Sequence, residues 1–155
     1  MKLAVKISRI VTCVAVTLYT IFVCYLCGQS VYYFTFRILK ADSGAYYSEV
    51  SSVPPEAVPH IVVGVALLLL GAASIVLMFR RGRLSACLSG GAAVACAVLG
   101  MCIDTMLAEV MFVRYKLGIA DLDAWLYVKP MAAYLCICAA VVYIVLYLVA
   151  YRKQK

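Results

Sequence analysis

The sequence predicts an all-α integral membrane protein, a four-helix transmembrane bundle made by a single membrane domain over residues 1–155. Of the 155 residues, 67% are hydrophobic and only 14% are charged, whereas soluble domains average about 45–50% apolar and about 25% charged residues. The apolar residues form four runs, each close to the ~20 residues that cross a hydrocarbon layer of ~30 Å. Lipid must therefore cover most of the apolar surface.

The first predicted span covers residues 10–33 and follows a short basic segment. Its apolar core exceeds the ~7–15 residues of a secretory signal peptide, so we interpret it as a retained span. Aromatic residues between positions 32 and 36 crowd its far end, which is typical of the headgroup level of a membrane. The polar, proline-containing stretch over 41–59 predicts an outer loop after this span.

The second predicted span covers residues 60–79, and Pro59 suits its first turn. A short basic turn over 80–83 separates it from the third span, at 85–107. An interfacial amphipathic segment is expected directly after the third span, to about residue 118.

The fourth predicted span covers residues 131–151 and is opened by Pro130. A basic tail, Arg152–Lys155, follows it. Four spans place both termini on the same side of the membrane.

The distribution of charge predicts which side that is. Nine of the fourteen Lys and Arg residues flank the N-terminus, the turn after the second span and the C-terminus, and no acidic residue lies there. By the positive-inside rule both termini face the cytoplasm, as expected of a multi-pass protein of the cell membrane. The net charge of +7 then belongs to membrane flanks that can meet anionic lipid, and nucleic acid is not an expected partner.

Small residues at helical spacing predict close packing of the spans. The third span carries Gly90, Ala93, Ala97 and Gly100 on one stripe, which ends at Asp104. Small residues let a neighbouring helix approach closely in lipid. Gly64 and Gly71 are expected to allow such an approach on the second span. The same spacing on the first span selects a stripe of Cys and Thr residues: Cys13, Thr17, Thr20, Cys24 and Cys27.

Asp104 is the first candidate for an ion or ligand site, because it is the one acid well inside an apolar run. The alternative is a purely structural carboxylate that pairs with Arg37 or Arg114 near the outer interface. His60, the single histidine, is expected at the same depth, either as a ligand or in helix packing.

The cysteines provide a second candidate site, one for redox chemistry. Cys24 and Cys27 lie one turn apart on the first span, and Cys102, Cys136 and Cys138 are expected at similar depth. A CxxC pair at a helix end is compatible with a quinone-linked thiol oxidoreductase. A free cysteine inside an apolar segment is also simply a small, soft apolar residue that packs well.

The sequence thus predicts a non-enzymatic protein, an integral or accessory subunit of a membrane complex of transport or channel type. Its expected partners are itself or other membrane subunits, and the bilayer. No catalytic or metal-ligating motif is present in the sequence, and no cofactor is expected beyond lipid contacts. Two alternatives stay open: a small transporter or channel that uses Asp104, and the thiol oxidoreductase, which would need a quinone.

Overall fold

The structure is a computed structural model and describes residues 2–42, 55–80, 82–111 and 127–152. Over these residues the chain is all-helical. The helices are α1 (Lys2–Asp42), α2 (Val58–Phe79), α3 (Arg83–Cys102), α4 (Met106–Met111) and α6 (Val128–Arg152).

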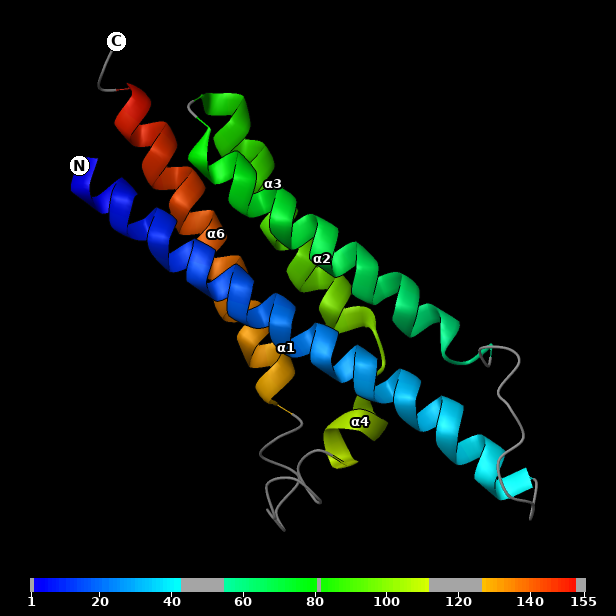
Figure 1. Ribbon diagram of the computed structural model, residues 1–155. Helices are drawn as coiled ribbons and strands as arrows, with labels where there is room; N and C mark the ends of the chain where they lie inside the picture. The colour runs from blue at the N-terminus through cyan, green and yellow to red at the C-terminus, as the bar shows by residue number, and fades with distance from the viewer. Residues whose placement is uncertain (1, 43–54, 81, 112–126, 153–155) are drawn as a thin grey trace.

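The four long helices pack side by side in the cyclic order α1, α2, α3, α6 (Figure 1). Helix α1 also contacts α3 across the bundle, and the short α4 packs against α1. Both ends of the chain and the α2–α3 turn gather at one end of the bundle, whereas α4 lies toward the opposite end (Figure 1).

Among the described residues, four helical segments are long and apolar enough to cross a membrane: Leu3–Thr35, Val58–Phe79, Arg83–Cys102 and Val128–Arg152. This confirms the coarse prediction from the sequence. Only 22–39% of the residues in the most apolar window of each segment are buried inside the bundle. The remaining apolar surface needs lipid or a protein partner to cover it.

Two helix boundaries differ from those expected. Helix α1 is continuous for 41 residues, about 60 Å, and extends beyond residues 10–33 at both ends. Helix α3 ends at Cys102 instead of near residue 107. Ile103 adopts an extended backbone (φ −76°, ψ 130°), so the third apolar run is divided between α3 and α4.

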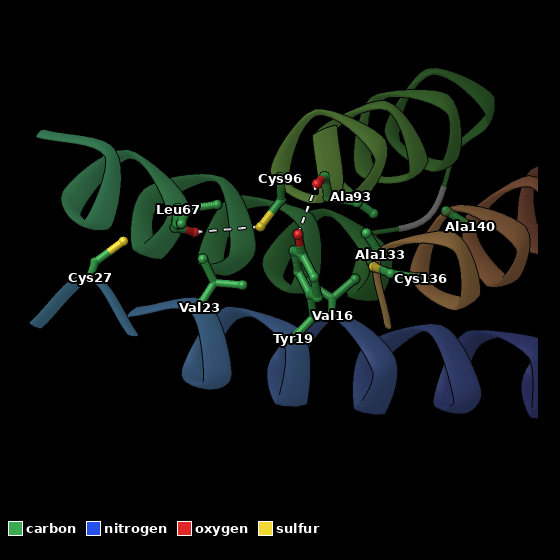
Figure 2. Packing of buried hydrophobic residues seen from close by; sticks show 11 residues of the cluster. Val16, Tyr19, Val23, Cys27, Leu67, Ala93, Cys96, Ala133, Cys136 and Ala140 are labelled. Atoms are coloured by element: carbon green, nitrogen blue, oxygen red, sulfur yellow. Dashed lines mark hydrogen bonds between the residues drawn. The ribbon is translucent and has the colours of Figure 1, made fainter. Parts of the chain in front are cut away.

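The centre of the bundle combines large residues from α1 and α2 with small residues from α3 and α6 (Figure 2). Val16, Tyr19 and Val23 of α1 and Leu67 of α2 supply most of the volume. The small residues that face them are Ala93, Cys96 and Ala97 of α3 and Ala133, Cys136 and Ala140 of α6. Small side chains let helix backbones approach closely, which is the main source of helix association in lipid.

The stripe predicted for α1 coincides only in part with the buried face: Thr20 and Cys27 are buried and Cys13 and Cys24 are half-buried. Thr17 is exposed, whereas Thr12, Val16, Tyr19 and Val23 are buried. The buried face also includes large residues that a search for small or polar side chains leaves out, because on this helix they fill the space that the small residues of α3 and α6 leave open.

Hydrogen bonds to backbone carbonyls join neighbouring helices inside the bundle. The Ser74 hydroxyl on α2 donates to the carbonyl of Ser89 on α3 at 2.9 Å. The Thr12 hydroxyl on α1 lies 3.0 Å from the carbonyl of Ala139 on α6. Such bonds satisfy polar groups that have no access to water and fix the rotation of each helix about its axis.

The α2–α3 turn depends on one glycine. Gly82 has φ 145°, a conformation that L side chains rarely adopt. Its N–H donates to the Tyr147 hydroxyl at 3.1 Å, so the turn is also tied to α6.

Candidate functional site

A group of polar residues, most of them buried or half-buried, lies where α3 ends and α4 and α6 begin. We call it the polar junction and define it as His60, Asp104, Thr105, Glu109 and Lys129. The Lys129 ammonium donates to the Ile103 carbonyl at 2.9 Å and to the Thr105 hydroxyl at 2.7 Å. It also forms an ion pair with the Glu109 carboxylate at 3.2 Å.

The ion pair is shielded from solvent, since the Lys129 and Glu109 side chains are only 13% and 10% exposed. The Thr105 hydroxyl also donates to the Glu109 carboxylate, at 2.5 Å. An ammonium has three N–H donors, and Lys129 uses all three within the protein. The pair therefore ties the start of α6 to the α3–α4 break, and neither charge is left without a partner.

Asp104 is not on the packed stripe of α3, contrary to the spacing. It follows the end of that helix and its side chain is exposed. Its carboxylate accepts the Met106 N–H at 3.0 Å, the two-residue pattern of an Asx turn. This hydrogen bond explains why the chain leaves α3 and starts α4 within three residues, so the carboxylate shapes the backbone.

His60 joins the start of α2 to the same break. The ring is buried, with Nε2 2.7 Å from the Asp104 carbonyl and Nδ1 3.2 Å from the Glu56 carbonyl. Phe34 of α1 packs against the ring, with 5.4 Å between ring centroids. The structure thus brings His60 and Asp104 together through the backbone of Asp104.

A pocket of about 260 Å³ opens beside the polar junction. It is lined by Met101, Asp104, Met106, Glu109, Lys129 and Pro130. Because Glu109 and Lys129 satisfy each other, Asp104 is the lining side chain that carries an exposed charge.

The side chains of two other predicted members of this site are not among those that the structure describes. Arg114 falls between the described ranges, and of Arg37 only the helical backbone is described. Glu109 and Lys129 were not singled out as site residues from the sequence. The available signal was their opposite charge at the same predicted membrane level, each just beyond an apolar run.

The candidate thiols occupy different environments. Cys27 and Cys136 are buried, Cys24 is half-buried beside the Gly64 carbonyl at 3.5 Å, and Cys102 and Cys138 are exposed on α3 and α6. All five are free thiols. Within the described ranges, no three His, Cys, Asp or Glu side chains form a group that could hold a metal ion.

The side of α3 that faces away from the bundle is the second notable feature. We call it the exposed face of α3; it comprises Leu84, Cys87, Leu88, Gly91, Ala95, Val98 and Cys102. At helical spacing these residues share one stripe opposite the buried Gly90, Ala93, Ala97 and Gly100. A side chain added at Gly91 would meet nothing within 4 Å, so this small-residue surface is uncovered.

Comparisons of the chain with models of protein families, with curated proteins and with solved structures found no match.

Proposed function

We propose that this chain is a non-enzymatic membrane subunit that assembles with a second copy of itself through the exposed face of α3. The observation that carries the proposal is the composition of that face. Cys87, Gly91 and Ala95 follow one another at intervals of four residues and are all exposed. This is the small-xxx-small spacing at which helix backbones pack closely in lipid.

The other three long helices present a different surface outward. Their large exposed residues are mostly Val, Leu, Ile and Tyr, including Leu18 and Ile21 on α1, Leu68 on α2, and Leu135 on α6. Lipid tails solvate such residues as well as a protein would, so these faces gain little from a partner. The narrow surface of α3 gains close backbone contact, which lipid cannot supply.

A second copy is the partner we favour, because both copies would insert in the same orientation. Both chain ends and the α2–α3 turn lie at one end of the bundle (Figure 1), and nine of the fourteen Lys and Arg residues belong to these segments. We infer that this end faces the cytoplasm of a cell membrane. Two copies then present the exposed face of α3 in parallel, as a two-fold dimer requires.

The test is a pair of matched substitutions. Gly91→Leu fills the exposed face of α3, and Gly28→Leu makes the same change at an exposed position of α1 where an added side chain also meets nothing within 4 Å. We expect Gly91→Leu to weaken self-association on the order of tenfold, and Gly28→Leu to leave it unchanged. Energy transfer between labelled copies in liposomes, measured against dilution in lipid, gives the dissociation constant of each variant.

A dimer that both substitutions weaken equally, or a monomer at every lipid dilution, would overturn the proposal. The chain could instead form a complex with a different membrane protein. If Gly91→Leu disrupts that complex and Gly28→Leu does not, the exposed face of α3 is still the interface, but the partner is not a second copy. The transport or channel character of such a complex stays a prediction, as do the roles of Asp104 in transport and of the thiols in redox chemistry.

A further inference from the structure

An apolar groove with a volume of about 570 Å³ runs along the outside of the bundle between α1 and α6. It is lined by α1 between Ala4 and Val11 and by α6 between Leu135 and Leu146. Ser8 and Cys138 are the lining residues that carry a hydroxyl and a thiol. The groove reaches toward the end of the bundle where the two chain ends lie (Figure 1).

Small residues make the groove hollow. Ser8 is buried and Ala139 is half-buried, and the Thr12 hydroxyl, one turn from Ser8, lies 3.0 Å from the Ala139 carbonyl. The larger Ile7 and Val142, which also line the groove, are about half exposed. The two backbones therefore approach closely between larger side chains. A hollow of this kind loses dispersion contacts unless an apolar group fills it.

The length of the groove favours an acyl chain as that group. From Leu146 to Leu135 the groove follows eleven positions of α6, or about 16 Å. This is about half of the ~30 Å hydrocarbon layer, the depth of one leaflet. A membrane-spanning helix would extend far beyond the groove, whereas an acyl chain that enters from the headgroup level ends where the groove ends.

The charges near the end of the groove favour an anionic headgroup. Lys6 belongs to the same turn as Ala4 and Ile7, Arg152 follows Leu146 by less than two turns, and both cations are exposed. All seven acidic residues of the sequence fall between positions 42 and 123, outside the segments that lead to this end. Each Lys or Arg at the membrane surface strengthens binding of acidic lipid on the order of fivefold.

We propose that the groove between α1 and α6 is a binding site for an acidic phospholipid of the leaflet at the basic end of the bundle. One acyl chain occupies the groove, and the phosphate lies among the cations at the ends of α1 and α6. The site belongs to a single copy of the chain and does not depend on assembly through α3.

Native mass spectrometry of the delipidated protein in a mild detergent tests the occupant. Dioleoyl phosphatidylglycerol and dioleoyl phosphatidylcholine are added together at equal concentrations, so that only the headgroups differ. We expect the first bound lipid to be phosphatidylglycerol, with a preference of at least about fivefold. Dihexanoyl phosphatidylglycerol should bind at least about tenfold more weakly than the dioleoyl lipid, because its chains are too short to fill the groove. Equal binding of the two headgroups, or of the two chain lengths, would overturn the proposal.

Matched substitutions locate the site. Cys138→Phe fills the groove and should weaken binding of the first dioleoyl phosphatidylglycerol at least about tenfold, whereas Ala73→Phe, at an exposed position of α2, should leave it unchanged. Arg152→Gln should lower the headgroup preference at least about twofold, and Arg80→Gln, which removes a charge at the α2–α3 turn, should not. If the two members of each pair behave alike, the lipid binds elsewhere and the proposal is wrong. The comparisons of headgroup and chain length need no substitution, so they decide the proposal even if Cys138→Phe fails to fold.

Discussion

At the scale of single residues, Tyr19 and Gly100 form a close contact at the centre of the bundle. The Tyr19 hydroxyl donates to the Ala97 carbonyl at 2.9 Å, so the ring crosses the face of α3 beside Gly100. A Cβ added at Gly100 would lie 2.5 Å from that hydroxyl oxygen and 2.9 Å from two ring carbons. A rigid ring held by a hydrogen bond cannot move aside without losing that bond.

Gly100→Ala is therefore expected to lower the free energy of unfolding by about 2 kcal/mol through overpacking. Gly64→Ala is the matched control, because its new Cβ would lie 3.7 Å from the Cβ of Cys27, an ordinary contact. This variant should be neutral or more stable by up to about 1 kcal/mol, since alanine is the better helix former. Thermal unfolding in a mild detergent measures both, and equal effects would contradict the packing around Tyr19.

At the scale of elements, the division of the third apolar run into α3 and α4, begun by Asp104, is also held by side chains from outside that run. Lys129 of α6 binds the Ile103 carbonyl and the Thr105 hydroxyl inside the break, and Glu109 of α4 neutralises it. Because the pair is almost fully shielded, removing one charge leaves the other without compensation.

We expect Lys129→Met to lower the free energy of unfolding by about 3 kcal/mol, because the Glu109 carboxylate stays buried without its cation. Combining it with Glu109→Gln should recover most of the lost free energy of unfolding, since no buried charge is then left without a partner. Lys6→Met, at an exposed lysine of α1, is the control for loss of a positive charge. Thermal unfolding is measured for the unmodified protein, Lys129→Met, the double variant and Lys6→Met. A double variant as unstable as Lys129→Met would contradict the ion-pair explanation.

At the scale of the whole molecule, the single orientation inferred for the bundle determines how two copies can meet. Parallel copies that pack through the exposed face of α3 bring Cys87 of one copy near Cys87 of the other. Cys102 lies on the same face, whereas the exposed Cys138 belongs to α6.

Mild oxidation in native membranes with a lipid-permeable catalyst is thus expected to cross-link two copies through Cys87 or Cys102. The dimer band on a non-reducing gel should fall at least about fivefold when both are replaced by serine, because cross-linking requires the thiols to approach to disulfide distance. Cys138→Ser should leave it unchanged. A cross-link that persists without Cys87 and Cys102 would place the interface elsewhere.

The number of long apolar helices was predictable because it depends on hydropathy averaged over some twenty residues. Four apolar runs of membrane-crossing length require helices, since the backbone must satisfy its hydrogen bonds in lipid. The buried face of α3 coincides with the stripe at Gly90, Ala93, Ala97 and Gly100. On α1 the predicted stripe is buried at Thr20 and Cys27 but exposed at Thr17, because the burial of each position depends on the volumes that the other helices supply.

The candidate site was harder to predict because its geometry is set by contacts distant in the sequence. The hydrogen bond of the Asp104 side chain to the backbone competes with continuation of the α3 helix. The apolar composition of the run does not indicate which of the two prevails. The ion pair between Glu109 and Lys129 joins two elements that enter the same end of the bundle. Counting along the spans predicted His60 and Asp104 at similar depth, and the two are in contact, but the carbonyl partners of the ring belong to the backbone, which sequence patterns do not report.

The length of α1 has a consequence for the surroundings of the bundle. A rod of about 60 Å tilted by as much as about 40° still rises roughly 45 Å along the membrane normal, well beyond the ~30 Å of hydrocarbon. Tilt alone cannot place the whole helix among acyl chains, so in a bilayer of this thickness the ends of α1 would reach the headgroup level, where its basic first turns can meet anionic lipid.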